Sequence, residues 1–358
     1  IGIRGFGLAA IDVIRAIACE FGEFINVDSK NKGCEYQSEN NLNYLFVPFS
    51  LDGLPPVAKP FNAAIDNLYK PTDDQIEEYG ETIGNKNIQE NADDTLFLLK
   101  AFAKVAAPIF KKLPLSKFNE TSSEDVKTLI INYLTKDDFT HSWISSIELP
   151  RKQIIEEYIE MAFNTTAISL DYCIGQVWRH CQPTMYKKLS FNECKPEVFA
   201  EIIKLDESTK RYSYGPPVES LQQLLALHHA QVLNLDFTNN PDFDLNEKGW
   251  NLIHKKQSIT VDFMINSIVD SPKIKTVNSP IVKNLLLDNL INSVHDDLGV
   301  LTDENGYLLS ENEQNHVPIA LLGRLAKGTI IGVDAILECM GERPKQWATE
   351  AVKKHTVY

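Results

Sequence analysis

The chain has 358 residues, of which 43% are hydrophobic and 23% are charged, a composition typical of a folded globular protein. Lys and Arg total 35 against 49 Asp and Glu, so the formal net charge is −14. This acidic balance argues against nucleic-acid partners and against an anionic-membrane surface. The length exceeds that of one ordinary domain, so we expect two units or one unit with a large insertion.

Targeting signals and cysteine motifs are lacking in the sequence. No apolar run approaches the ~20 residues of a membrane helix, and the apolar start lacks the basic region and cleavage site of a signal peptide. The six cysteines form no C-x-x-C pair and show no metal-ligand spacing with histidine. We therefore expect a cytoplasmic protein without a membrane partner. Because the chain opens on Ile1 inside a strand-like run, we also expect an upstream portion of the same protein.

The first predicted elements have the order of a βαβ unit. Residues 1–6 form a short apolar run that favours a strand, and residues 8–21 carry apolar side chains every three or four positions, as in a helix. Residues 44–50 predict a second strand, which the turn at 52–53 ends. Strand, glycine turn and helix in this order are the start of a dinucleotide-binding fold.

The turn in this unit has the spacing Gly5-x-Gly7-x-x-Ala10. In a dinucleotide site the first glycine permits a tight turn, the second lets the backbone approach a pyrophosphate, and the small third residue lets helix and strand pack closely. Amide groups at the helix start, including those of Leu8 and Ala9, would then hold the phosphates. These five residues are the candidate pyrophosphate contacts.

Several polar residues near this unit are candidates for the rest of a nucleotide site. Asp12 lies near the start of the helix, where a carboxylate is favoured by the helix dipole as well as by any ligand role. Asp28 lies about 20 residues after the second glycine, the spacing of an acid that binds the adenosine ribose. Ser50 and Asp52 end the second strand and are also candidate nucleotide contacts, which makes Asp52 the alternative acid for the ribose.

From about residue 71 the sequence changes to amphipathic helical patterns, and strands return after about residue 250. Helices are predicted at 94–105, 124–134 and 153–167, and the helical stretch runs to about 235. An extended run follows at 258–266. We therefore expect an α/β protein with a Rossmann-like dinucleotide-binding sheet and a large, mainly helical insertion. The expected segments are 1–70 and 251–358 for the α/β part and 71–250 for the insertion.

The last part of the chain carries two glycine signals. Asn305-Gly306 between apolar flanks predicts a hairpin. Farther on, an apolar strand at 317–322 leads into a glycine turn, followed by a helix through about residue 340. That turn contains Gly323, Arg324 and Gly328, and it could bring a ligand close to a helix start or simply relax the backbone.

The remaining distinctive residues predict packing rather than chemistry. His228 and His229 are adjacent on a predicted helix and cannot share a metal-binding face. We expect the run 178–180 to be an aromatic packing site with a basic edge and the run 214–217 to be a rigid turn. No Ser-His-Asp set, H-E-x-x-H or phosphate-binding Walker loop can be assembled.

Taken in order, several segments resemble one family, the bacterial FAD/NAD(P)-binding proteins that include aspartate N-monooxygenase-like flavoenzymes. Residues 3–13 are similar to that family's R-G-x-G-L-T-x-I-D-V motif, and residues 47–55 are similar to its S-R-x-G-L-P segment. Further similar segments are 211–227, 261–266, 279–282 and 323–334. The region from about residue 71 to 171 carries no such similarity.

The resemblance implies an oxidoreductase that uses both NAD(P)H and FAD, acts on a small-molecule substrate and has its flavin-binding portion upstream. It suggests N-hydroxylation of a small amine. NAD(P) would lie at the first glycine turn, and Gly323, Arg324 and Gly328 would lie near the flavin. Two departures matter: Leu51 stands where the family has Arg, which puts NADP preference in doubt, and Ala9 stands where it has Thr.

Two other functions fit the same sequence. A non-catalytic nucleotide-binding module would use the helical segment to recognise a partner. A single-cofactor NAD-dependent dehydrogenase would use it as a substrate domain and would need a catalytic His or Asp against the nicotinamide, which the sequence does not place.

Overall fold

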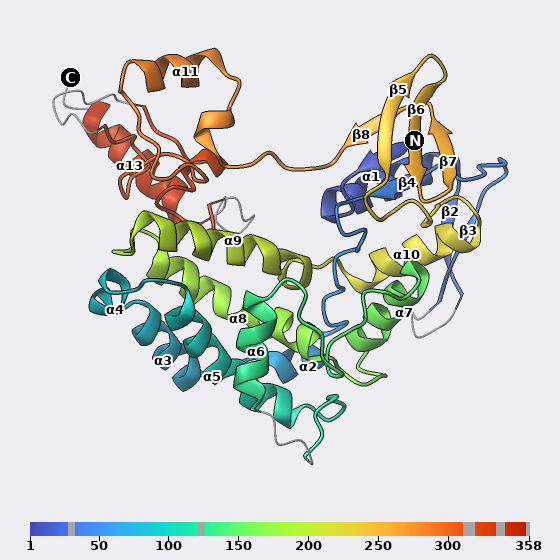
Figure 1. Ribbon diagram of the computed structural model, residues 1–358, viewed down its shortest axis with the longest axis horizontal. Helices are drawn as coiled ribbons and strands as arrows, with labels where there is room; N and C mark the ends of the chain where they lie inside the picture. Colours follow the sequence, from blue (N-terminus) through green and yellow to red (C-terminus); the bar gives the residue numbers. More distant parts are fainter. Residues whose placement is uncertain (28–32, 121–124, 311–318, 334–340, 356–358) are drawn as a thin grey trace. The chain divides into compact units, whose positions relative to one another are not determined.

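The computed structural model describes residues 1–27, 33–120, 125–310, 319–333 and 341–355, and it is mixed α/β, as expected. The chain divides into two compact units (Figure 1). The first comprises Ile1–Pro71, Ala103–His180 and Ser208–Val269, and the second comprises Thr72–Phe102, Cys181–Glu207 and Asp270–Tyr358. Three helices contribute residues to both units: α5 (Leu96–Lys112), α8 (Leu170–Leu189) and α9 (Pro196–Ser213).

A small parallel sheet begins the first unit. Its strands are β1 (Gly2–Arg4), β4 (Val47–Phe49) and β8 (Met264–Asn266), in the order β4-β1-β8. Residues 232–240 run parallel to the outer edge of β4, but they join it only through isolated bridges at Phe46 and Ser50. Pro48, between these two bridges, has no N–H to donate to that edge, so the ladder is interrupted there.

Helix α1 (Leu8–Phe21) connects β1 toward β4 and confirms the predicted helix. It buries the apolar face formed by Ala10, Ile11, Ile14 and Ala18. An antiparallel hairpin that the sequence did not predict, β2 (Glu23–Asn26) and β3 (Cys34–Gln37), follows it. The Tyr36 hydroxyl donates to the Ala18 carbonyl at 2.8 Å, which ties the hairpin to α1. Asp28 lies outside the described residues.

An antiparallel meander packs on the parallel sheet. It consists of β5 (Asp242–Asn246), β6 (Gly249–His254) and β7 (Gln257–Val261). The sequence predicted one extended run at 258–266, but the structure divides it between β7 and β8, which belong to different sheets. The reason is tertiary: Val261 is buried with Val47 and Leu252 in a core cluster, whereas Ile265 pairs with Ile3.

Helices form most of the rest of the first unit, and beyond residue 71 they lie where the sequence predicted a helical region. They are α2 (Ala63–Asp66), the short 3₁₀ turn η1 (Asn67–Tyr69), α6 (Val126–Thr135), α7 (Arg151–Ala162) and α10 (Val218–His229), with parts of the shared helices. The predicted rigid turn at 214–217 joins α9 to α10. Gly215 is required there because a Cβ atom would lie 1.5 Å from the Val57 carbonyl oxygen.

The second unit contains α3 (Asp73–Ile83), α4 (Lys86–Glu90), α11 (Pro280–Leu287), α13 (Glu342–His355) and two 3₁₀ turns, η2 (Ile274–Thr276) and η3 (Arg324–Ala326). The turn predicted at Asn305-Gly306 is present, with Gly306 at φ +83°, although single bridges rather than regular strands flank it. Among the described residues, no helix is long and apolar enough to cross a lipid bilayer.

The predicted strand at 317–322 and the helix after Gly328 are wrong where the structure describes them. Residues 319–322 make only one bridge, and residues 329–333 are not helical. Ile330 and Val333 are instead buried in a small cluster with Ala326, so core packing overrides the local pattern. The rest of the predicted helix, including Asp334, lies outside the described residues.

Candidate functional site

The turn between β1 and α1 has the backbone that the glycine spacing predicted. Gly5 has φ +109°, a conformation that residues with a Cβ rarely adopt, and its N–H donates to the Phe49 carbonyl at 2.7 Å. A Cβ on Gly5 would lie 3.2 Å from the carbonyl carbon and oxygen of Ser267. The turn is therefore pressed between the ends of β4 and β8, and only glycine fits there without strain.

Gly7 caps the start of α1 and faces open space. Its φ and ψ of −95° and −164° suit any residue, and a Cβ placed there would meet no atom within 4 Å. No side chain caps the helix, and the first intrahelical bond runs from the Ile11 N–H to the Gly7 carbonyl at 3.1 Å. The N–H groups of the first turn, at Leu8 and Ala9, therefore point outward from exposed residues without an intrahelical partner.

Ala10 completes the motif on the inner side of the helix. It is fully buried, so its small side chain lets α1 lie close to the sheet. Asp12, by contrast, projects into solvent with 76% of its side chain exposed and pairs with Arg15 at 3.7 Å. Asp12 stands beyond the first turn of α1, where it is too far along the helix to hold a ligand at the helix start, and its solvated ion pair with Arg15 explains its position.

The carboxyl end of β1 is a point where its two neighbours in the sheet lie on opposite sides and are reached through different connections. One connection leads through α1 to β4 on one side of β1, and the much later β8 lies on the other side. Open parallel sheets bind ligands in the crevice outside the strand ends at such a point. Gly5 and Ser267 lie at this point, and the Oγ atom of Ser267 is buried with no hydrogen-bond partner among the described residues.

A cation and an aromatic ring also lie at this edge. Arg4, the last residue of β1, is exposed, and its guanidinium lies 5.7 Å from the centre of the Phe243 ring. That ring packs against Phe49 at 5.4 Å and Trp250 at 6.2 Å and remains 40% exposed. Arg4 has no carboxylate partner within 4 Å among the described residues, so it gives the edge a positive charge in a chain that is acidic overall.

Ser50 and Asp52 lie in the turn that follows β4. The Ser50 hydroxyl donates to Asp52 Oδ1 at 3.1 Å and accepts from the Gly53 N–H at 3.0 Å. The same Oδ1 accepts from the Leu54 N–H at 3.1 Å, and Oδ2 forms an ion pair with Arg211. The carboxylate that the sequence suggested as a ribose ligand is therefore already bound within the protein.

Gly323, Arg324 and Gly328 belong to the second unit. Gly323 faces open space before η3, whereas a Cβ on Gly328 would lie 2.5 Å from the Val300 carbonyl oxygen. Arg324 donates to the Asp270 carbonyl at 2.7 Å and pairs with Glu207 at 3.5 Å. Since a three-residue 3₁₀ turn follows in place of an α-helix, these residues do not provide the amide cradle that a flavin pyrophosphate needs.

Two cavities of the first unit are separate from the glycine turn. The larger, of 960 Å³, lies among the helices, and Asp52, Arg211, Tyr212, Tyr133 and His141 are among its lining residues. Tyr133 and Tyr212 meet edge to face at 6.2 Å, and burial raises the pKa of both hydroxyls, so they stay protonated. The cavity therefore combines protonated tyrosine hydroxyls with four carboxylates, those of Asp52, Asp137, Asp138 and Glu148, and with the cations of Lys136 and Arg211.

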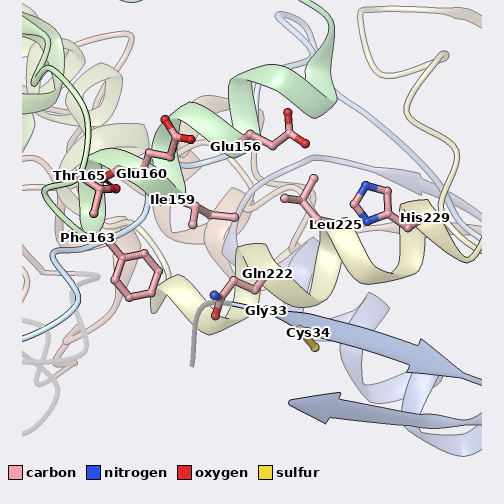
Figure 2. Close-up of a pocket in the computed structure, with 10 residues that line it drawn as sticks. All are labelled: Gly33, Cys34, Glu156, Ile159, Glu160, Phe163, Thr165, Gln222, Leu225 and His229. Carbon is pink, nitrogen blue, oxygen red and sulfur yellow. Dashed lines mark hydrogen bonds between the residues drawn. The ribbon is translucent and has the colours of Figure 1, made fainter. Parts of the chain in front are cut away.

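The smaller cavity, of 370 Å³, lies between α7, α10 and the start of β3 (Figure 2). Cys34, Glu156 and His229 are among its lining residues. Burial raises the pKa of the Cys34 thiol, so it is not an activated nucleophile, and burial lowers the pKa of His229. No cluster of three or more metal-ligating side chains occurs among the described residues. This cavity carries no recognisable chemistry.

Sequence reasoning did not select Arg4, Arg211 or Ser267 as site residues. Arg4 was visible as the charged last residue of an apolar strand, directly before the glycine motif. Arg211 and Ser267 lie more than 200 residues from that motif and reach its surroundings only through the fold. Neither a protein-family model nor a curated protein matches this chain.

Proposed function

We propose that the chain binds the pyrophosphate of a nicotinamide dinucleotide at the β1–α1 turn, as the NAD(P)H-binding part of a flavin-dependent oxidoreductase with a Rossmann-like sheet. The observation that carries the proposal is the uncapped, open start of α1. Gly7 leaves space where any side chain would stand, and exposed amides at Leu8 and Ala9 have no partner within the helix. Such a helix start is a ready anion site.

The surroundings of the turn support the same ligand. Gly5 allows the tight turn, and the strand order diverges at the same point, where open parallel sheets bind their ligands. Arg4 adds a positive charge beside the phosphates, and the exposed Phe243 ring offers a flat apolar surface at the same edge. In a chain with a net charge of −14, a cationic edge of this kind favours an anionic ligand.

When bound, the reduced nicotinamide supplies a hydride for an acceptor flavin, which we expect on another portion of the same protein. The residues described above hold and orient the dinucleotide, and the helix dipole stabilises its phosphates. We assign no flavin contact to Gly323, Arg324 or Gly328, since their geometry does not fit one. N-hydroxylation of a small amine remains an expectation from the resemblance.

Titration of the purified chain with NADPH and with NADH, followed by the nicotinamide fluorescence, tests the proposal. Saturable binding of at least one dinucleotide is expected, and AMP should compete poorly because it lacks the pyrophosphate. Failure of both dinucleotides to bind at millimolar concentration would refute the proposal. Oxidation of NAD(P)H by the chain with no flavin present would favour the single-cofactor dehydrogenase.

A further inference from the structure

The 960 Å³ cavity of the first unit shares no lining residue with the glycine turn, and its size suits a small organic ligand. Its buried end is formed where α8 and α9 cross, by residues that include Ile174 and Tyr212. Gly175 makes this crossing close, because a Cβ atom there would lie 2.2 Å from the Tyr212 Cβ atom. Its exposed wall comes from residues between 136 and 148, in the connection from α6 to α7. The cavity therefore joins a base of packed helices to a polar rim.

The charged side chains of the lining leave two negative charges in excess. Arg211 pairs with Asp52, so these two charges cancel. Lys136 balances one of the remaining three carboxylates in the count. These are the exposed side chains of Asp137, Asp138 and Glu148. None of the three has a cation within 4 Å among the described residues. The rim therefore favours a positively charged ligand.

Three other ionisable groups at the cavity do not change this balance. The Nδ1 atom of His141, in the lining, accepts from a main-chain N–H at 3.3 Å, as a neutral imidazole does. Asp171 and Arg151 stand next to the lining without belonging to it. Asp171 accepts from the Ser145 N–H at 3.0 Å, and Arg151 donates to the Ile147 carbonyl at 2.8 Å. Their charges are opposite, so the excess of two negative charges stays.

The lining suits an extended organic cation better than a metal ion. No set of three or more His, Cys, Asp and Glu side chains among the described residues could hold a metal. The carboxylates are instead spread along the wall, with Asp137 and Asp138 adjacent and Glu148 farther along the connection. Aromatic and aliphatic side chains, such as Phe139 and Ile174, share the lining. Carboxylates bind ammonium groups, aromatic faces attract them, and aliphatic side chains cover methylene groups.

We infer that the cavity binds an aliphatic diamine or polyamine through the carboxylates of Asp137, Asp138 and Glu148. Two ammonium groups match the two excess negative charges, and the methylene chain between them allows each to reach a different carboxylate. The cavity is separate from the β1–α1 turn, so this inference goes beyond the proposed function and does not rest on it.

Isothermal titration calorimetry of the whole chain tests the inference, with 1,4-diaminobutane, butylamine and sodium butyrate as probes at low salt, where charges are least screened. Diaminobutane should bind at one site and at least about tenfold more tightly than butylamine, because its second ammonium group meets a second carboxylate. Butyrate should not bind. The double variant Asp137→Asn/Asp138→Asn should weaken diaminobutane binding by at least about tenfold. Glu148→Gln should weaken it through a separate residue.

Asp73→Asn/Asp74→Asn is the matched control, since it also removes two adjacent, exposed carboxylates, but in the second unit. It should leave diaminobutane affinity within about twofold of the wild type. Equal losses in the two double variants would show that the amine follows the net charge of the chain and not the cavity, and would overturn the inference. Equal affinity for diaminobutane and butylamine, or no binding of diaminobutane at millimolar concentration, would also overturn it. If a melting curve shows that one variant does not fold, the other rim variant decides.

Discussion

Replacement of Gly7 by Asp should change stability and ligand binding in opposite directions. Gly7 already has the extended backbone of a helix-capping residue, and the space around it is empty. An Asp side chain there can accept from the free amides of the first turn, which is worth a few tenths of a kcal/mol over Gly. Its charge also meets the positive end of the helix dipole, worth about 0.3–1 kcal/mol. The variant should therefore unfold at higher urea concentration than the wild type.

Dinucleotide binding should be lost in the same variant. The carboxylate occupies the amides that would hold the pyrophosphate and repels its charge. Loss of two hydrogen bonds to a charged group, about 1.5–3 kcal/mol each, raises the dissociation constant by roughly a hundredfold or more. The assay is NADPH titration by fluorescence beside urea unfolding followed by circular dichroism.

Gly323→Asp provides a matched control. Gly323 has nearly the same backbone angles, −96° and −167°, and also faces open space, but it lies in the second unit. Its replacement should leave NADPH affinity within about twofold of the wild type, far below the effect expected at Gly7. Unchanged NADPH affinity in Gly7→Asp, with a stable fold, would refute the reasoning about the helix start.

Three further outcomes are expected. Gly5→Ala should lower the free energy of unfolding, measured in urea, by about 1–3 kcal/mol, because both φ +109° and the 3.2 Å distance to Ser267 oppose a Cβ atom. Gly7→Ala is the comparison, and an equal or smaller loss of stability in Gly5→Ala would contradict this prediction. Burial, aided by Arg179, lowers the pKa of His180 below 6.5, so the unfolded chain takes up the proton first and stability should fall as pH drops below about 6.5. His180→Gln should reduce the difference in unfolding free energy between pH 7.5 and pH 5.5. If the difference is the same in the variant and the wild type, His180 is not the source of this pH dependence. Burial raises the pKa of the Cys194 thiol to about 11, so little of it is ionised at pH 7.5. Iodoacetamide should therefore label the exposed Cys19 before Cys194, as measured by peptide mass spectrometry. Faster labelling of Cys194 would contradict the prediction.

The sequence predicted correctly those helices, strands and turns whose residues lie within a few positions of one another. The helix at 8–21, the strand at 47–49 and the helices of the middle region follow from apolar periodicity, and the tight turn at Gly5 follows from a glycine that no other residue can replace. The hairpin of β2 and β3 was missed. The patterns failed where packing outweighs them, as at Ile330 and Val333, whose burial holds residues 329–333 in an irregular path.

What the sequence alone determined is the motif: a strand, a turn that requires Gly5, and an uncapped helix start at Gly7, because these depend on neighbours within a few positions. The tertiary structure alone decided the surroundings of that motif. It placed β8 beside β1, and it paired Asp52 with Arg211 across 159 positions of the chain. A carboxylate and its distant partner leave no local pattern in the sequence, so the charge balance beside the motif emerges only once the chain has folded.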